Sequence, residues 1–351
     1  MARYLVTGGA GFIGSHLTEK LLERGHDVVV LDNLSGGTRD RVPGTATLIV
    51  GSVADERLVA EVFTSFQFNG VFHLAAFAAE GISHAVKRHN YVTNMLGSVN
   101  LINAALASKL DFFGFASSVA VYGRAEPPMR ERDQPIPVDS YGNAKLAVER
   151  ELDITMRLQG LPYFALRMHN VYGEWQNMSD PYRNAVAIFL NQVMRGEPIS
   201  VYGDGGQIRA FTYVGDIVGT FLASAERRDA WGHVLNVGSS ATSTVLNLAH
   251  IVRDVMGAPN HPIVHLPARH EVHRAYTDSA WARKLLGEWP ETDLRAGLAK
   301  TAKWARAHGP ADLVSNLELE VPQERSAAWV GWIQDRLGGT ESGSERRAAG
   351  T

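Results

Sequence analysis

Three glycines at a spacing of three residues near the N-terminus constrain the fold of this chain most strongly. They lie in Thr7-Gly-Gly-Ala-Gly-Phe-Ile-Gly14, which follows the short apolar run Arg3-Tyr-Leu-Val-Thr7 and precedes the amphipathic segment Ser15-His-Leu-Thr-Glu-Lys-Leu-Leu22. An apolar strand, a glycine turn and an amphipathic helix in this order are typical of the first unit of a dinucleotide-binding α/β fold. The sequence therefore predicts a strand, a tight turn and a helix that hold a pyrophosphate.

Each glycine has its own role in this interpretation. Gly8 permits the tight turn, Gly11 lets a pyrophosphate approach the backbone, and Gly14 lets the helix pack close to the strand. A second apolar strand, Asp27-Val-Val-Val-Leu31, ends at Asp32. The Asp32 carboxylate would accept hydrogen bonds from the adenosine ribose and repel a 2′-phosphate, which favours NAD over NADP. Taken alone, the same residues would also suit a glycine-rich turn and a strand-end cap.

Composition excludes several function classes. The chain has 351 residues, of which 45% are hydrophobic and 20% are charged, as in an ordinary soluble globular protein. Its formal charge of −3 offers no general basic field for nucleic acid or a membrane surface. It contains no cysteine, which excludes disulfides, thiol nucleophiles and cysteine-based metal sites. The start does not read as a signal peptide and no apolar stretch reaches membrane-spanning length, so we expect a cytoplasmic protein.

Apolar strand-like runs alternate with helix-like segments through the first half of the chain. Strands with little polar alternation, separated by helices, indicate a parallel sheet covered on both faces. The predicted fold class is therefore α/β with a doubly wound parallel sheet. The expected strands beyond the first two are Thr47–Val50, Gly70–Ala75, Asp111–Ala116 and Tyr163–Met168, and the expected helices include Ser98–Leu106 and Lys145–Leu152.

The pattern changes near Glu174, where loops rich in Gly, Asn, Asp and Pro begin. We expect residues 1–174 to form the nucleotide-binding domain and residues 175–337 to form mainly a smaller α/β substrate lobe. The run His233-Val-Leu-Asn-Val237 has the character of a strand, so the chain is expected to return to the larger domain near residues 211–240. Residues 338–351 are polar and rich in small side chains, which predicts a disordered tail.

A tyrosine and a lysine four residues apart carry the predicted chemistry. The spacing places Tyr141 and Lys145 on one face of a helix, where the ammonium favours the phenolate and makes the tyrosine a useful base. Ser118 ends the preceding strand, at the edge where open α/β sheets place ligand-binding groups. Its hydroxyl would bridge the substrate and Tyr141. Ser117 and Ser118 would also suit simple turn caps, Ser117 especially.

Further motifs follow in order along the chain. They are Asp32-Asn-Leu, His73–Ala76, Asn94–Gly97, Ser117–Gly123, Leu166–Gly173, Asp180–Asn184, Gly203–Tyr213 and Leu266–Val272. With the glycine loop and the Tyr-x-x-x-Lys motif, they resemble the extended short-chain dehydrogenase/reductases, and more narrowly the bacterial UDP-glucose 4-epimerase branch. The resemblance runs from residue 1 to about residue 305. It implies a Rossmann-type sheet, a smaller C-terminal substrate-binding lobe, and a tightly bound NAD.

The resemblance also assigns cofactor contacts by position. It places them in the glycine loop, in the turn after the second strand, at the ends of the next strands and in the Tyr-x-x-x-Lys motif. These residues are Gly8, Gly11, Phe12, Ile13, Asp32, Asn33, Ser35, Gly37, Ser52, Val53, Leu74, Ala75, Ala76, Tyr141 and Lys145. Ser52-Val53 stands where many relatives carry Asp-Ile or Asp-Val, so the adenine contact there would use a hydroxyl or the backbone.

For the reaction, the resemblance implies epimerisation of a UDP-hexose at C4 through a 4-keto sugar. Tyr141 would take the proton of the 4-hydroxyl while C4 passes a hydride to NAD, Ser118 would relay the proton, and Lys145 would hold the nicotinamide ribose. Arginines are expected on the diphosphate and a glutamate on the uridine ribose; an ordinary surface ion pair is the alternative for each arginine. The implied substrate-binding residues are Ser118, Tyr141, Asn170, Arg183, Arg209, Arg269 and Glu271.

The two residues after Ser118 distinguish this prediction from neighbouring activities. A sugar 4,6-dehydratase resembling this fold carries Asp-Glu there, and a UDP-glucuronate decarboxylase carries Glu at the second position. This chain has Val119 and Ala120 instead. A non-catalytic NAD-binding module is the alternative from another class.

The hexose and the assembly are left open. UDP-glucose/UDP-galactose is slightly favoured over UDP-glucuronate/UDP-galacturonate, whose C6 carboxylate would have to meet Arg183, Arg88 or His169. Helices near residues 84–106 and 142–159 are expected to pair two copies into a homodimer. No catalytic metal is predicted, because the later histidines do not form a helical His-Glu-x-x-His pattern.

Overall fold

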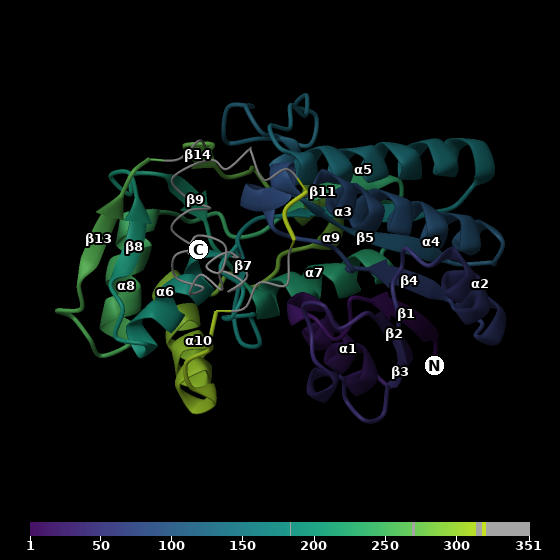
Figure 1. The fold of residues 1–351 in the computed structure, drawn as a ribbon. Coiled ribbons are helices and arrows are strands. Elements are labelled where there is room, and N and C mark those ends of the chain that lie inside the picture. The colour runs from purple at the N-terminus through teal and green to yellow at the C-terminus, as the bar shows by residue number, and fades with distance from the viewer. Residues whose placement is uncertain (183, 269–270, 314–317, 321–351) are drawn as a thin grey trace, which may run out of the picture.

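A sheet of seven parallel strands organises the larger part of the molecule (Figure 1). In this computed structural model the described residues are 1–182, 184–268, 271–313 and 318–320. The strand order is β11-β6-β5-β4-β1-β2-β3. The strands are β1 (Arg3–Thr7), β2 (Asp27–Asp32), β3 (Thr47–Val50), β4 (Gly70–His73), β5 (Phe112–Ser118), β6 (Tyr163–Met168) and β11 (His233–Val237). The predicted doubly wound parallel α/β fold is confirmed.

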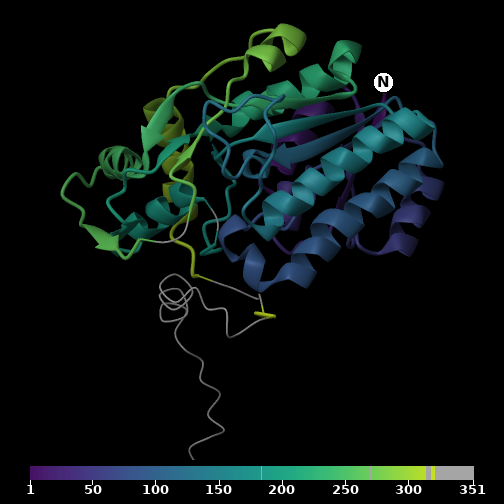
Figure 2. The same ribbon diagram turned by 90° about the horizontal axis from the view of Figure 1, so that it is seen from above.

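Helices cover both faces of the sheet (Figure 2). Successive residues of a strand point to opposite faces, and β1 shows this directly because Leu5 and Val6 belong to different cores. Leu5 packs in the core shared with α2 (Glu56–Ser65), α4 (Gly97–Leu106) and α5 (Ser140–Gln159). Val6 packs in the core shared with α1 (Phe12–Glu23), α7 (Val214–Glu226) and α9 (Ala280–Leu286).

Helix α5 has a defined cap at each end, and the N-terminal cap sets the residue at which the helix begins. Its N-cap Asp139 accepts a hydrogen bond of 2.7 Å from the amide of Gly142. At its C-terminus Gly160 takes the left-handed conformation, with φ of +78°. The predicted Tyr141 and Lys145 therefore fall in the first two turns of a well-capped helix of 20 residues.

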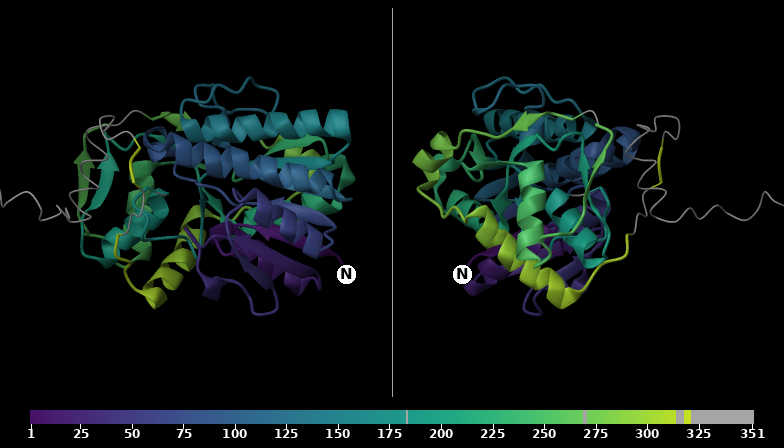
Figure 3. Two further views of the ribbon diagram at one scale, coloured as in Figure 1. Left: turned by 45° about the vertical axis from the view of Figure 1, so that its right-hand side comes forward. Right: turned by 90° about the vertical axis from the view of Figure 1, so that its left-hand side faces the viewer.

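A smaller lobe stands beside the sheet (Figures 1 and 3). Its own core includes Val186, Val201, Leu248 and Leu298, all at most 1% exposed. Small sheets join β8 with β13 in parallel and β9 with both β12 and β14. The elements are α6 (Ala185–Met194), β8 (Ile199–Tyr202), β9 (Ile208–Ala210), β12 (Thr242–Thr244), α8 (Val245–Val255), β13 (Ile263–Leu266), β14 (Arg274–Ala275) and α10 (Leu294–His308).

The chain crosses between the two parts more than once. The predicted strand at His233–Val237 is confirmed as β11, which pairs with β6 at the edge of the large sheet. Helices α7 and α9 also pack on that sheet. A division of the chain into domains at residue 174 stays a prediction, and the tail predicted at residues 338–351 lies outside the described residues.

Short elements complete the connections. Two short strands, β7 (Val171–Tyr172) and β10 (Thr212–Tyr213), pair in parallel. The short helical elements are η1 (Arg39–Arg41), η2 (Glu80–Ala85), α3 (Lys87–Tyr91), η3 (Val92–Leu96), η4 (Val119–Val121) and η5 (Arg228–Ala230). The π-helical η3 joins α3 to α4.

Candidate active site

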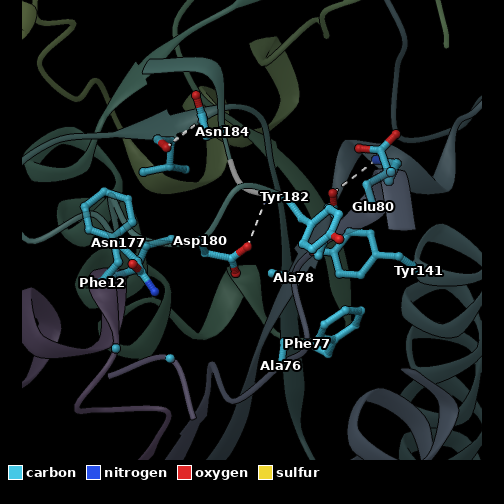
Figure 4. A pocket seen from close by; sticks show the side chains of 18 of the residues that line it. Phe12, Ala76, Phe77, Ala78, Glu80, Tyr141, Asn177, Asp180, Tyr182 and Asn184 are labelled. Atoms are coloured by element: carbon cyan, nitrogen blue, oxygen red, sulfur yellow. Dashed lines mark hydrogen bonds between the residues drawn. The ribbon is translucent and has the colours of Figure 1, made fainter. Parts of the chain in front are cut away.

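A cavity of about 1430 Å³ is lined by the carboxyl ends of the parallel strands and by the smaller lobe. Figure 4 shows part of it, with Phe12 on one side and Tyr141 and Tyr182 on the other. Every described residue that the sequence assigned to the cofactor or the substrate lines this one cavity. Arg183 and Arg269, also predicted to bind substrate, lie outside the described residues.

The glycine turn has no room for side chains. Gly8 has φ of +72°, and a Cβ atom there would lie 2.6 Å from the amide nitrogen of Ala75. A Cβ atom on Gly14 would lie 2.1 Å from the carbonyl oxygen of Gly8, so this glycine allows α1 to approach the turn. Phe12 and Ile13 begin α1 and line the cavity. The backbone amides at this helix start have the positive potential that a pyrophosphate requires.

Asp32 is held in place from two directions. Its Oδ2 accepts a hydrogen bond of 3.0 Å from the amide of Ala10, and its Oδ1 accepts one of 2.8 Å from the amide of Leu34. The side chain is only 7% exposed, yet it lines the cavity. The carboxylate therefore caps the following turn and also faces the space where an adenosine ribose would lie. Asn33, Ser35 and Gly37 line the cavity beside it.

The remaining predicted cofactor residues form the adjacent wall. Ser52 accepts a hydrogen bond of 3.1 Å from the amide of Ala54, so its hydroxyl fixes the turn in which Val53 is buried. The amide of Ala75 donates to the Thr7 hydroxyl over 3.3 Å, which ties β1 to the end of β4. Leu74 and Ala76 line the cavity on either side.

Lys145 is almost completely enclosed. It is 2% exposed, and its Nζ donates a hydrogen bond of 2.7 Å to the carbonyl oxygen of Ala116 on β5. The same nitrogen lies 4.7 Å from the ring centre of Phe115 and 5.7 Å from that of Tyr141. Burial lowers the pKa of Lys145 to about 7, and the nearby Glu149 carboxylate opposes that shift.

Tyr141 and Ser118 face the same cavity from two neighbouring elements. The amide of Tyr141 donates to the Ser83 hydroxyl over 3.2 Å, so η2 contacts the start of α5. Ser118 ends β5, and its Oγ accepts a hydrogen bond of 3.1 Å from the amide of Ala120. A serine hydroxyl that accepts this bond can still donate its own proton into the cavity.

The expectation that Ser117 caps the turn was wrong, because Ser118 is the N-cap of η4. The hydroxyl of Ser117 instead donates to the buried carboxylate of Glu149. Glu149 also accepts two hydrogen bonds from Arg167, of 2.9 Å from Nε and 2.6 Å from Nη2. This ion pair, 3% and 5% exposed, holds α5 against β5 and β6 directly below Lys145.

Arg209 and Glu271, assigned by the sequence to phosphate and ribose, form an ion pair with each other. Nη2 of Arg209 lies 3.0 Å from Oε2 of Glu271. The guanidinium also donates to the backbone oxygens of Val272, over 2.6 Å, and His273, over 3.0 Å. The side chains of the pair are 14% and 21% exposed. The partners are thus fixed and partly accessible, and both line the cavity.

Asn170 lies at a strained position of the backbone. Its φ is +40°, and its Nδ2 donates to the carbonyl oxygen of Ala210 over 3.1 Å. The neighbouring His169 was considered for a sugar carboxylate, but it is 1% exposed and its pKa is lowered to about 4 by burial. Neither His169 nor Arg88 is among the described residues that line the cavity, so the structure gives no support to a contact between either side chain and a sugar carboxylate.

Two features of the site were not recognised in the sequence. His73 is 1% exposed and lies 2.7 Å from the Thr7 hydroxyl and 2.8 Å from the Ser98 hydroxyl, which connects α4 to the glycine turn. Burial lowers the pKa of His73 to about 3, so it is neutral. Arg41 of η1 lines the cavity with its guanidinium 5.9 Å from the ring centre of Trp175. Only the position of His73 in an apolar run could have pointed to a buried polar role.

Among the described residues, no group of three or more His, Cys, Asp or Glu side chains is placed to hold a metal ion. Within those residues, no helix has the length and apolar character needed to cross a membrane.

The doubly wound sheet, the glycine turn and the Tyr141–Lys145 couple together define a dinucleotide-dependent enzyme of the extended short-chain dehydrogenase/reductase type. The chain belongs to the NAD dependent epimerase/dehydratase family, whose profile matches residues 4–238. Its cofactor is accordingly NAD. The cradle observed here fits that group, because the glycine positions admit no side chain and Asp32 faces the ribose position.

Individual relatives agree with this assignment. The chain is 33% identical over 309 residues to a putative UDP-glucose 4-epimerase of Methanocaldococcus jannaschii, with 86% of this chain and 98% of the relative covered. It is 32% identical to a UDP-N-acetyl-alpha-D-glucosaminuronate decarboxylase of Bacillus cytotoxicus, with 87% and 98% covered. Among solved structures, the UDP-glucose 4-epimerase of Thermotoga maritima with UDP-glucose is 35% identical at a TM-score of 0.82, with 87% and 99% covered.

Proposed function

We propose that this protein is a UDP-hexose 4-epimerase that works through a transient 4-keto sugar. The observation that carries the proposal is the convergence of Tyr141, Lys145 and Ser118 on one cavity that also contains the complete NAD cradle. A second ligand has space there, because the lining continues from the glycine turn to Arg209 and Glu271 in the smaller lobe.

The residues act on the proton of the sugar 4-hydroxyl. When held by the glycine turn and Asp32, NAD would supply the hydride acceptor for C4 and the hydride donor for the opposite face of the sugar, so no external oxidant would be consumed. Tyr141 takes the hydroxyl proton as the C4–O bond becomes a carbonyl and gives it back when the hydride returns. Ser118 passes this proton between sugar and tyrosine. Lys145 holds a positive charge beside the ring of Tyr141 and thereby favours the phenolate.

Epimerisation is supported over elimination of water or loss of carbon dioxide. Elimination needs an acid and a base beside Ser118, but η4 presents Val119 and Ala120 at that place. The acidic side chains that do line the cavity come from other elements, and one of them, Asp139, serves as the N-cap of α5. The chain therefore has no carboxylate at the position where the related reactions require one.

The uridine diphosphate is proposed to bind at the smaller lobe. Asn170 and Arg209 are suitable partners for the diphosphate, and Glu271 for the uridine ribose. The ion pair between Arg209 and Glu271 keeps both side chains at the cavity wall. Arg183 and Arg269 are further proposed contacts in segments outside the described residues.

A neutral hexose is favoured over a uronic acid. Glu80 and Asp139 line the cavity near the start of α5, where Tyr141 lies. Carboxylates on this wall oppose a second carboxylate at C6 of the sugar. UDP-glucose and UDP-galactose are thus the preferred pair, and UDP-glucuronate and UDP-galacturonate the alternative.

The test is direct. Purified protein is incubated with each of these four UDP-sugars in turn, and the products are separated by chromatography without added NAD. We expect conversion of UDP-glucose and UDP-galactose into each other. Faster conversion of the two uronates would support the alternative, and binding of NAD without conversion of any C4 epimer, N-acetyl forms included, would leave only a cofactor-binding module.

A further inference from the structure

A short segment after α10 returns to the wall of the cavity. Residues 318–320, called the strap below, lie beside η2 and α3, where they appear as an isolated yellow piece of ribbon in Figures 1 and 2. The motifs shared with relatives end near residue 305, before this point. The Thermotoga structure is covered almost completely while part of this chain remains unmatched. The contacts of the strap with η2 and α3 define its position on the cavity wall.

Glu320 caps a helix that lacks a cap of its own. The residue before α3 is Val86, which makes no side-chain cap hydrogen bond. Glu320 supplies one from a distance of more than 200 residues: its two carboxylate oxygens accept hydrogen bonds of 2.7 Å from the amides of Arg88 and His89. Its own amide donates to the carbonyl oxygen of Ala85 over 3.0 Å. A carboxylate that accepts amide protons at a helix start is strongly stabilising.

Leu319 fills an apolar cluster that joins the two sides of the cavity. On the sheet side the cluster includes the buried Ala79, Ile82 and Ala85 of the η2 region. On the lobe side it includes the partly buried Tyr182 and Tyr202. Tyr182 and Tyr141 both line the cavity, and Figure 4 labels both. The leucine thus adds an apolar contact to a cluster that contains residues from both sides of the cavity.

The wall held by the strap also touches the catalytic helix. Ser83 of η2 accepts a hydrogen bond from the amide of Tyr141, and Asn90 of α3 donates one of 2.8 Å to the carbonyl oxygen of Ser140. His84 and His89, from the same two elements, line the cavity. A chain of direct contacts therefore connects Glu320 to the start of α5.

We propose that Leu319 and Glu320 are positioning residues for UDP-sugar binding, because they fix the η2–α3 wall against the smaller lobe around the sugar end of the cavity. The contacts of the strap are with η2, α3 and the apolar cluster at the cavity wall, so we expect its effect on sugar binding to exceed its effect on NAD binding. This inference rests on the proposed function for the identity of the substrate.

The experiment uses the full chain with bound NAD. Glu320→Ala removes the cap, Leu319→Ser removes the apolar contact, and Glu318→Ala in the neighbouring exposed position is the matched control.

KM and kcat are measured with whichever UDP-sugar the wild type converts fastest, and the dissociation constant of UDP-glucose is measured by calorimetry. Loss of a helix cap corresponds to about a fivefold change in an equilibrium constant, so we expect KM and the dissociation constant to rise by roughly that factor in each strap variant. Bound NAD, read from the absorbance of the denatured supernatant, should stay at the wild-type level.

Unchanged KM and dissociation constant in both strap variants would overturn the inference. So would loss of bound NAD in proportion to the loss of sugar binding, because the strap would then support the whole fold. Glu320→Gln, which keeps one acceptor oxygen, should restore part of the affinity. A wild-type protein that binds UDP-glucose but converts no C4 epimer among the UDP-sugars, N-acetyl forms included, would refute the proposed function, while the calorimetric comparison of the variants would still decide the role of the strap.

Discussion

Nζ of Lys145 lies 5.7 Å from the ring centre of Tyr141 and donates its hydrogen bond to the carbonyl oxygen of Ala116. The lysine is thus held by the strand and not by the tyrosine. Its charge acts on the phenol through space, in a pocket that excludes water from the ammonium. Such an arrangement makes the protonation of Lys145 sensitive to everything that enters the cavity, above all to the cofactor.

Replacing Tyr141 with Phe tests the proposed base. The variant loses only the phenolic oxygen, so we expect turnover to fall by about 10² to 10⁴-fold, the contribution typical of general acid–base catalysis. Bound NAD should stay at the wild-type level. Tyr91→Phe on α3, where the hydroxyl contacts the exposed Asn143, is the matched control. Wild-type turnover in Tyr141→Phe would exclude Tyr141 as the base.

The buried Lys145 predicts a pH dependence of stability. Its pKa is about 7 in the folded chain against 10.5 as the reference value. Between these pH values the unfolded chain binds the additional proton, so the free energy of unfolding should rise with pH, by at most about 1.4 kcal/mol per unit. Below pH 7 both states carry the proton and this dependence ends.

Urea titrations at pH 7, 8 and 9 measure the effect. Lys145→Met should remove this part of the slope and should be more stable than the wild type near neutral pH. Lys303→Met on the exposed side of α10 is the control and should keep the wild-type slope. Equal slopes in wild type and Lys145→Met would show that the lysine is not desolvated as described.

Asp32 predicts the choice between NAD and NADP. Asp32→Asn keeps one oxygen for the amides of Ala10 and Leu34 but removes the charge that repels a 2′-phosphate. We expect the preference for NAD to fall by roughly tenfold or more, in line with the value of a charged hydrogen bond. Dissociation constants for the two cofactors give the result. Asp27→Asn, at the other end of β2, should leave the preference unchanged.

The exposed apolar face of η3 and α5 predicts a homodimer. Met95, Leu96, Ile154 and Leu158 are between 38% and 79% exposed. Large exposed apolar side chains on two contacting helical elements are typical of an interface. Leu158→Glu should convert the dimer to a monomer in sedimentation velocity, whereas Val264→Glu, at an exposed apolar residue of β13, should not. A wild-type monomer at micromolar concentration would contradict the prediction.

Most of the fold could be predicted because its signals are local. Buried parallel strands are continuous apolar runs, and the glycine turn admits one conformation, so β1, β2 and the helix between them were placed almost residue for residue. The candidate site followed from the same logic, since the carboxyl ends of parallel strands meet at one edge. That edge brings Ser118, Asp32 and Leu74 to a single cavity.

The remainder depends on pairings that leave no local pattern. The hydrogen bond from the Ser117 hydroxyl to Glu149 depends on how α5 packs against β5, and no local run of residues indicates that packing. The same applies to Glu320, whose partners lie more than 200 residues away. The burial of His169 likewise depends on a distant residue, Gly238, because a Cβ atom there would lie 2.3 Å from the imidazole ring.

The edge strand β11 has a consequence for how this chain can be made. Its neighbours α7 and α9 complete the core behind β1 and β6, so part of that core is not synthesised until residue 286. A nascent chain that has only the glycine turn and the catalytic helix still exposes one apolar face of its sheet. We therefore expect residues 1–174 expressed alone to aggregate, because the apolar face that α7 and α9 cover in the full chain stays exposed.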